Sequence, residues 1–442
     1  MKIIEIPFCY YPDAVGGTEV YVRSLSESLQ RMGAEVVVAA PAPKNGCYVH
    51  EGIPVKRYGI SGSIQDLAEL YGAGDPEGAA NFGRLLDQEK PDIVHFHAFT
   101  RGASLLAMRE ARKRKIPLVF TYHTPTVGCQ RGSLMRWGSE VCEGKADARI
   151  CAPCVLHAHG LPKPIAEAVS LLPAGLGRAA SVCGLSGSWV TALRTRPLVE
   201  TRIDIFYQML AEADHLVAVC DWVQSVLERN GVPREKMTLS RQGVSSGRHA
   251  AATAAETHDQ NLKVVYLGRL DPSKGVHVLV KAVRQLGDVG MTLDIFGVKQ
   301  GESGQKYEDE LKLIVSDDSR IRFHRPIAAS EVPERLAAYD VMAVPSQWLE
   351  TGPLVVLEAF ASGLPVIGSR LGGIRELVRD GIDGVLVDPC ASPERWAAML
   401  RRMADDRTFL KRLKSGILPP RTMDAAADDM MRLYEELCGR KK

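Results

Sequence analysis

The chain has 442 residues, about three times the length of a single compact domain, which excludes a small disulfide-stapled scaffold. Its residues are 45% hydrophobic and 24% charged, and this ordinary balance excludes a disordered or fibrous chain. The formal net charge is only +2, so we expect no nucleic-acid partner, and any anionic ligand has to be met by a local site.

The first residues are unlike a secretory leader or a membrane anchor. A single lysine and a short apolar run broken by Glu5 and Pro7 lack the longer apolar core of a signal peptide. Nowhere do 18 apolar residues follow one another. Most of the ten cysteines are scattered, as expected for reduced thiols. We therefore expect a cytoplasmic protein, at the inner face of the plasma membrane if it meets a membrane at all.

Short β-branched runs alternate with longer amphipathic ones along the first half of the chain. Such alternation predicts parallel strands covered by helices on both faces. The predicted strands are Ile3–Ile6, Glu35–Ala40, Asp92–His97, Pro117–Tyr122 and His215–Val219. Helical patterns lie between them, as at Thr18–Met32 and Gly102–Arg114.

A second series of strands begins after the polar, alanine-rich stretch Ser245–Asn261. Its predicted strands are Leu262–Leu267, Thr292–Phe296, Arg320–Phe323, Val341–Pro345, Leu364–Gly368 and Gly384–Val387. The pattern predicts two α/β domains in tandem, at 1–248 and 249–420, followed by an amphipathic helix at 421–442.

Open parallel sheets bind ligands beyond the carboxyl ends of their strands, so informative residues should follow strands. Gly16 and Gly17 come after the first strand and open a helix, where glycine lets backbone N–H groups approach an anion. A tight turn capped by Thr18 would explain the same pair without a ligand. No dinucleotide or P-loop motif and no Asp-x-Asp occurs, so arginine, lysine and backbone N–H groups would have to hold a diphosphate.

Two cations follow the first strand of the second series. Arg269 and Lys274 stand five residues apart between a predicted strand and a helix. This pair suits the two phosphates of a nucleotide, because arginine binds phosphate oxygens in a fork and lysine acts as a point charge. Two cations on a loop are also typical of a solvated surface, but their place directly after a buried strand favours a site.

Two carboxylates follow the strand that ends at Pro345. Glu350 falls in the loop, and Glu358 lies eight residues later in an apolar helix, where a charged residue is rare without a partner. Carboxylates in this arrangement can accept hydrogen bonds from sugar hydroxyls. The N–H groups of Gly352, Leu354 and their neighbours at the helix start can hold phosphate.

With these motifs in this order, the chain resembles a retaining glycosyltransferase of family 4. The matching motifs are Gly16-Gly17-x-Glu19, Gly268-Arg269 with Lys274-Gly275, Glu350-x7-Glu358, Glu358-Ala-Phe-Ala-x-Gly363 and Gly372-Gly373-Ile374-x-Glu376. The resemblance implies the GT-B architecture, in which two facing Rossmann-like domains enclose a central cleft and a C-terminal helix packs back toward the N-terminal domain.

The resemblance also implies a donor and a role for each residue. The donor is a nucleotide-diphosphate-sugar held mainly by the C-terminal domain, without a metal. Arg269 and Lys274 are expected to grip the diphosphate, Glu350 to contact the sugar hydroxyls and Glu358 to bind the ribose. Such cations favour the charge that gathers on the leaving diphosphate.

On the opposite wall, the resemblance places Gly17, with Gly16 beside it, against the phosphates. His123 is expected to reach the sugar near the reacting carbon. The acceptor is a hydroxyl of a glycan or a lipid-linked molecule. This hydroxyl is expected to attack the front face of the donor sugar, and the leaving phosphate takes its proton. The pathway implied is the synthesis of a cell-surface polysaccharide or glycolipid.

Three other functions share this architecture. A sugar-nucleotide epimerase is disfavoured by the two glutamates and two cations together. A glycan phosphorylase is disfavoured because no lysine context for pyridoxal phosphate is visible. A non-catalytic nucleotide-sugar-binding protein remains an alternative that activity measurements on variants of Glu350 or Lys274 would separate.

Four cysteines are clustered within a predicted insertion at about 124–200. Cys129, Cys142, Cys151 and Cys154 have the spacing C-x12-C-x8-C-x2-C. A C-x2-C with two further thiols nearby predicts a structural zinc site that orders a long loop. Two disulfides, an iron–sulfur cluster and four unbound thiols are the alternatives.

The apolar stretch Leu161–Leu198, which includes Trp189, allows two interpretations. It could rest on a membrane surface near a lipid-linked acceptor, and we favour this peripheral contact. It could equally form buried helices of the N-terminal domain.

Overall fold

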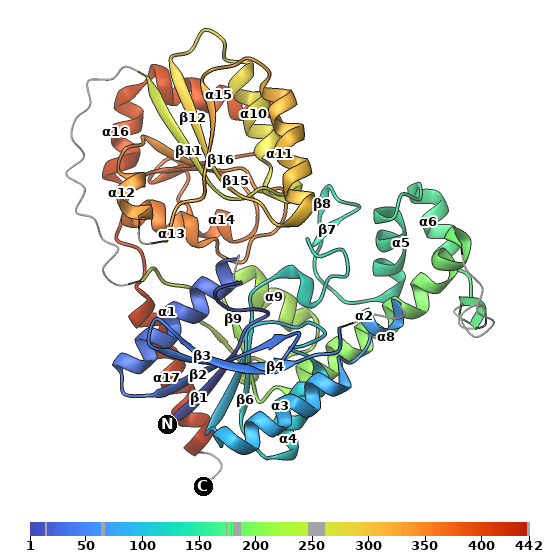
Figure 1. Ribbon diagram of the computed structural model, residues 1–442. Coiled ribbons are helices and arrows are strands. Elements are labelled where there is room, and N and C mark those ends of the chain that lie inside the picture. Colours follow the sequence, from blue (N-terminus) through green and yellow to red (C-terminus); the bar gives the residue numbers. More distant parts are fainter. Residues whose placement is uncertain are drawn as a thin grey trace. The chain divides into compact units, whose positions relative to one another are not determined.

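The computed structural model describes residues 1–13, 16–62, 67–173, 175–177, 179, 187–245, 261–329 and 331–439 (Figure 1). The chain divides into two units. Unit 1 comprises Met1–Ala14, Thr18–Ser240 and Ala427–Lys442, and unit 2 comprises Val15–Gly17 and Arg241–Ala426. The boundary expected between residues 248 and 249 lies outside the described residues.

Unit 1 is built on an eight-stranded sheet with the order β10-β9-β6-β5-β1-β2-β4-β3. All neighbours are parallel except the hairpin of β3 and β4. The strands are β1 (Lys2–Ile6), β2 (Glu35–Ala42), β3 (Gly46–His50), β4 (Ile53–Gly59), β5 (Ile93–Phe96), β6 (Leu118–Tyr122), β9 (His215–Ala218) and β10 (Met237–Leu239). The five strands expected here are confirmed, whereas β3, β4 and β10 were not expected.

Helices connect these strands. They are α1 (Gly17–Arg31), α2 (Leu67–Leu70), α3 (Pro76–Glu89), α4 (Leu105–Lys113), α5 (Ala148–Ala158), α6 (Lys163–Ser170), α8 (Ser188–Glu212) and α9 (Asp221–Arg229). The two helical patterns at Thr18–Met32 and Gly102–Arg114 are therefore confirmed. Side chains cap helix starts where the sequence offers them: Ser104 accepts from the N–H of Ala107 at the start of α4.

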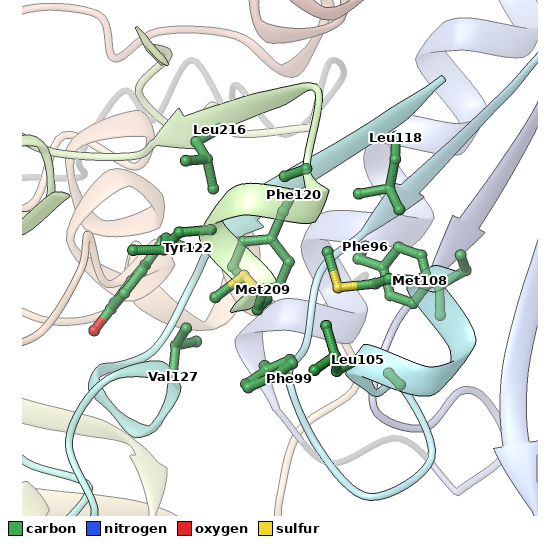
Figure 2. Close-up of a cluster of buried hydrophobic side chains, with 14 of the residues drawn as sticks. Phe96, Phe99, Leu105, Met108, Leu118, Phe120, Tyr122, Val127, Met209 and Leu216 are labelled. Atoms are coloured by element: carbon green, nitrogen blue, oxygen red, sulfur yellow. The ribbon is translucent and has the colours of Figure 1, made fainter. Parts of the chain in front are cut away.

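The core of unit 1 lies between the middle strands and the helices α4 and α8. Figure 2 shows Phe96 of β5 and Phe120 of β6 packed with Met108 of α4 and Met209 of α8. All four side chains are buried. Because the middle strands are apolar at most positions, the few polar residues within them stand out as exceptions.

The C-terminal helix α17 (Met423–Gly439) returns to unit 1, to which its residues from Ala427 onward belong. Its Tyr434 is fully buried, and the phenol oxygen lies 2.5 Å from Nδ1 of His95 on β5. This confirms the expected packing of the terminal helix against the N-terminal domain.

Unit 2 contains a six-stranded, fully parallel sheet with the order β13-β12-β11-β14-β15-β16. The strands are β11 (Leu262–Arg269), β12 (Met291–Val298), β13 (Ile321–His324), β14 (Val341–Val344), β15 (Val366–Ser369) and β16 (Gly384–Val387). All six expected strands are confirmed. The helices are α10 (Val276–Arg284), α11 (Gly301–Val315), α12 (Val332–Leu336), α13 (Leu354–Ala361), α14 (Gly372–Leu377), α15 (Pro393–Asp405) and α16 (Arg407–Ser415).

Strand order in unit 2 decides which loops meet. β11 pairs with β14, and β14 pairs with β15, so the loops that follow these strands leave the same edge of the sheet side by side. These loops carry the cations and carboxylates singled out in the sequence.

Within the described part of the chain, no helix is both long and apolar enough to span a membrane. Among the described residues of the apolar stretch 161–198 are α6 and the first part of α8, which pack with α5 to one side of the sheet (Figure 1).

Candidate active site

The centre of the candidate site in unit 2 is an ion pair between Lys274 and Glu350. Nζ of Lys274 lies 2.6 Å from Oε1 of Glu350. Lys274 ends a short 3-10 turn, η3 (Pro272–Lys274), in the loop that follows β11. Asp271 caps this turn by accepting from the N–H of Ser273 at 2.8 Å. The structure thus brings together two predicted residues that are far apart in the chain.

Backbone contacts hold the two loops in register. The N–H of Gln347, after β14, donates to the carbonyl of Ser273, after β11, at 2.7 Å. Gly275 has a left-handed φ of 72°, and a Cβ at this position would lie 1.9 Å from the carbonyl oxygen of Pro345. Only glycine allows this close approach, which explains the Lys274-Gly275 sequence.

The carboxylate of Glu350 is buried, and one of its oxygens accepts three hydrogen bonds. Besides Lys274, the hydroxyl of Ser346 donates to Oε1 at 2.7 Å and the indole N–H of Trp348 at 2.8 Å. Burial acts to raise the pKa of Glu350, but the charge of Lys274 and these donors outweigh it and hold the pKa below its usual value. Glu350 is therefore a stable carboxylate at neutral pH.

Arg269 is placed differently from Lys274. It is the last residue of β11, and its guanidinium donates to Oε1 of Gln300, which precedes α11, at 3.0 Å. Lys274 instead lies over the ring of Trp348, 5.0 Å from its centroid. The two predicted cations are thus held by separate neighbours, one near the loop after β12 and the other in the loop after β14.

The remaining predicted donor-binding residues of unit 2 surround the start of α13. Gly352 precedes the helix with a φ of 137°, Leu354 is its first residue, and the half-buried Glu358 follows one turn later. Pro353 occupies the N-cap and supplies no side-chain hydrogen bond. The N–H of Val356 donates to the carbonyl of Pro353 at 3.0 Å, and a phosphate site at this helix start stays a prediction.

The glycine pair Gly372-Gly373, at the start of α14, has a role that was not predicted from the sequence. The N–H of Gly373 donates to the carbonyl of Glu350 at 2.6 Å. A Cβ on Gly372 would come within 2.7 Å of the same carbonyl, and one on Gly373 within 2.6 Å of the N–H of Gly352. The pair packs directly on the loop of Glu350 and fixes its backbone. The sequence showed the glycine motif but could not show that it contacts this loop.

Gly16 and Gly17, which are grouped with unit 2, stand where α1 begins, as expected. Glu19, in the first turn of that helix and in unit 1, is buried. His123 follows β6 and is buried as well. The ring of Tyr21, from α1, meets the His123 ring edge to face at 4.7 Å between centroids.

His123 ends a buried chain of hydrogen bonds that the sequence did not reveal. Its Nε2 lies 3.0 Å from Nδ1 of His97, and Nε2 of His97 lies 2.5 Å from Oε2 of Glu5. The hydroxyl of Tyr434 donates to Oε1 of Glu5 at 3.3 Å and lies 2.5 Å from Nδ1 of His95.

At its other end, this series of hydrogen bonds reaches Thr121, whose hydroxyl lies 2.6 Å from Nε2 of His95. The available signal was a polar residue within an apolar strand: Glu5 interrupts β1, and His95 interrupts β5. The partner from residue 434 could not be inferred, because nothing local links it to these strands.

Burial keeps this group neutral. Burial raises the pKa of Glu5 to about 8, although the hydrogen bond from Tyr434 opposes the shift. Burial also lowers the pKa of His97 to about 3, and it holds the pKa values of His95 and His123 well below the usual range. At neutral pH we therefore assign a protonated Glu5 and three uncharged imidazoles.

One proton arrangement satisfies every link when Glu5 is protonated. Glu5 then donates to Nε2 of His97, and Nδ1–H of His97 donates to Nε2 of His123, which leaves Nδ1 of His123 carrying a hydrogen. If Glu5 loses its proton, both imidazoles reverse and Nδ1 of His123 becomes an acceptor.

Glu5, His95 and His97 also place their ligand-type atoms within 4.8 Å of one another. The hydrogen bond between His97 and Glu5, and those of His95 with Tyr434 and Thr121, already account for this closeness.

The predicted metal-binding cysteines are all free thiols in the structure. Cys129 follows a 3-10 turn, η1 (Pro125–Val127), and Cys142 follows the short strands β7 (Met135–Arg136) and β8 (Glu140–Val141). Cys151 and Cys154 lie on α5. The alternative of two disulfides is therefore wrong, whereas the zinc site stays a prediction.

The sequence matches two family models. One, described as Glycosyltransferase Family 4, covers residues 15–248, more than half of the chain. The other, described as Glycosyl transferases group 1, covers residues 251–417. The two matches follow one another along the chain, and each contains one of the two large sheets almost completely.

Similar curated proteins carry the name D-inositol 3-phosphate glycosyltransferase. The one from Corynebacterium efficiens is 28% identical over 437 residues, which cover 95% of this chain and 90% of that protein. The one from Salinispora tropica is 30% identical over 268 residues, and here the match spans only about half of each protein, 54% and 55%.

Solved structures of similar fold include sucrose-phosphate synthase from Thermosynechococcus elongatus, with a TM-score of 0.69, 20% identity and 99% of both chains covered. The Anabaena protein HepE, solved in complex with UDP and glucose, has a TM-score of 0.64 and 17% identity, covering 98% of this chain and 99% of that one. These likenesses confirm the expected fold class, two Rossmann-like α/β domains of the GT-B type.

Proposed function

Because the chain belongs to glycosyltransferase family 4, we propose that it transfers a sugar from a nucleotide-diphosphate-sugar to a hydroxyl acceptor, with retained anomeric configuration and without a catalytic metal. The observation that carries this proposal is the ion pair between the half-buried Lys274 and the buried Glu350 at the carboxyl ends of β11 and β14. In an open parallel sheet this is where a nucleotide-type ligand binds.

On the donor side, Lys274 supplies the mobile positive charge. An ammonium group has three N–H donors, and the contact with Glu350 engages one of them. The others suit oxygens of a diphosphate, while the fork of Arg269 suits a second phosphate. As the bond to the sugar breaks, negative charge gathers on the diphosphate, and these cations stabilise it.

Glu350 binds the sugar and does not transfer a proton. Its lowered pKa keeps it ionised, so it can accept hydrogen bonds from sugar hydroxyls but is poorly suited to donate a proton. Glu358, one turn into α13, would hold the ribose. The N–H groups of Gly352 and Leu354 would face phosphate oxygens at the helix start.

On the acceptor side, the low pKa of His123 makes it a weak base. We therefore assign it a neutral hydrogen bond to the sugar near the reacting carbon, through Nδ1–H, and not the removal of the acceptor's proton. This supports attack from the front face of the sugar, with the leaving phosphate taking the proton of the acceptor hydroxyl.

The test is a thermal-shift screen of the full chain against nucleotides and nucleotide sugars, since a ligand of the folded state raises the melting temperature. A shift with one diphosphate sugar identifies the donor. Product formation is then followed by NMR with glycan, lipid-linked and inositol phosphate acceptors, and an inverted anomeric configuration would contradict retention. A requirement for added metal after chelation would contradict metal independence, and binding without any transfer would favour a non-catalytic binding protein.

We also propose that the acceptor is lipid-linked and met at a membrane surface, in the synthesis of a cell-surface polysaccharide or glycolipid. Several large apolar side chains on and beside α6 and at the start of α8 are exposed: Ile165, Leu171, Leu172, Leu176 and Trp189. Leu171 is 77% exposed and Trp189 is 75% exposed. Flotation with anionic liposomes at low salt tests the contact, and a Leu171→Ser, Trp189→Ser variant should lose it.

A further inference from the structure

Four cysteines that the transfer reaction does not use lie in the segment between β6 and the middle of α5. Cys151 and Cys154 are three residues apart on α5, so their side chains share one face of the helix. Cys129 and Cys142 come from the irregular chain before this helix, and the N–H of Cys142 is fixed to the carbonyl of Leu134 at 2.8 Å.

Tertiary folding gathers these thiols in one place. The thiol of Cys151 interacts electrostatically with the thiols of Cys129, Cys142 and Cys154. The thiol of Cys142 interacts in the same way with those of Cys129 and Cys154. Each of these two thiols is therefore within electrostatic range of the other three.

Backbone N–H groups are directed at the sulfurs. The N–H of Trp137 donates to Sγ of Cys154 at 3.4 Å. The backbone N–H groups of Gly144 and Asp147 hydrogen-bond to the sulfurs of Cys142 and Cys151, respectively. Hydrogen bonds of this kind surround ligands of metal centres, because they stabilise the charge on the ligand atom and fix its orientation.

The segment that carries the thiols has little regular structure of its own. Its strands β7 and β8 have two residues each. Leu134 and Trp137 adopt left-handed backbone conformations, with φ values of 51° and 57°, which are unfavourable for residues other than glycine. Such conformations persist only where the surroundings determine them strongly, and a metal centre would supply such a constraint.

We propose that Cys129, Cys142, Cys151 and Cys154 together ligate a thiophilic metal centre that fixes this segment. Four thiolates are a usual ligand set for a structural zinc ion and for an iron–sulfur cluster. The role is structural: the segment leaves β6 just after His123, and the centre would hold the chain there without taking part in the transfer.

Sulfur spacing bears on which centre forms. Zinc–sulfur bonds of about 2.3 Å place the sulfurs of a closed zinc tetrahedron about 3.8 Å apart. Among the residues that the structure describes, no three of these sulfurs lie mutually within 4.8 Å. A single zinc ion would therefore draw the ligands closer together, whereas a cluster of several metal atoms accepts a wider set of thiolates.

Metal analysis of the full chain tests the proposal. The protein is purified without chelator or a metal-affinity step, once in air and once under anaerobic conditions, and zinc, iron and acid-labile sulfide are measured together with the visible spectrum. About one zinc per chain supports a zinc site, and about four irons with matching sulfide and visible absorption support a cluster. Metal at background level in both preparations overturns the proposal.

Variants locate the centre. Cys142→Ser and Cys154→Ser should each lose most of the metal, whereas Cys47→Ser, at an exposed position on β3, should retain it. Equal metal in all three variants overturns the assignment. Because a ligand variant could fail to fold, the wild-type chain is also titrated with a thiol reagent. Removal of the metal by a chelator should expose four more reactive thiols, and an unchanged count contradicts the proposal.

Discussion

His97 and His123 share a hydrogen bond, with Nδ1 of the first 3.0 Å from Nε2 of the second. His97 contacts Glu5 through its other nitrogen, so the proton on Glu5 decides which nitrogen of His123 carries a hydrogen. A carboxyl group on the first strand thereby controls a residue that follows β6. Because the whole group is buried, its protonation also affects folding stability.

Glu5→Gln should remove a pH dependence of stability. The pKa of Glu5 is raised to about 8 in the folded protein, against 4.5 for a free carboxyl, so the folded state holds more protons between these values. The stability that the protonated form provides is complete below about pH 4.5 and is lost as pH rises through 8, by up to about 1.4 kcal/mol per pH unit. Urea unfolding between pH 5 and 8 measures the slope.

Glutamine suits this test because its amide can donate to His97 and accept from Tyr434, like the protonated carboxyl. The loss of stability at acid pH provides the control. The pKa of His97 is lowered to about 3, so its contribution is present above pH 6.5 and is lost as pH falls through 3. Glu5→Gln should keep this acid-side loss, and an unchanged slope above pH 5 would contradict the assignment of Glu5.

Tyr434→Phe should destabilise unit 1. The phenol of Tyr434 contacts both His95 and Glu5, and its removal leaves buried polar atoms without that partner. A loss of about 1–3 kcal/mol in the free energy of unfolding is expected. Tyr71→Phe is the matched control, because the Tyr71 side chain is only partly buried. Equal effects of the two changes would show that the hydroxyl contacts of Tyr434 contribute nothing specific.

Lys274→Met should reduce kcat/KM about 100-fold or more, since it removes a cation from the diphosphate and the charged partner of Glu350. The pKa of Glu350 should rise in the variant, because the charge of Lys274 helps to lower it in the wild-type protein. Steady-state kinetics with Lys274→Met, Glu350→Gln and the double variant measure their coupling. Strictly additive losses would show that the two side chains act independently.

Gly275→Ala should destabilise unit 2 by about 2 kcal/mol or more and weaken donor binding, because the new methyl group meets the carbonyl of Pro345 at a left-handed position. Gly287→Ala is the control, since its Cβ has no neighbour within 4 Å. Calorimetric melting and donor titration measure both effects. A harmless Gly275→Ala would mean that the two loops are not held as closely as described.

The sequence by itself determined most of the buried strands and the loop residues that follow them. Apolar runs placed the five strands expected in unit 1 and all six in unit 2, because a strand buried on both faces has to be apolar along its length. The same logic put Lys274 and Glu350 in loops after strands. Short or half-exposed strands such as β3 and β10 escaped, since they lack that continuous pattern.

Only the tertiary structure decided which residues meet. Lys274 pairs with Glu350 because β11 and β14 are neighbours in the sheet, although two other strands lie between them in the chain. Glu5 meets Tyr434 because the last helix returns to the first sheet. Local sequence patterns record the burial of each residue but not its partner, since the partner depends on strand order and on where distant helices dock.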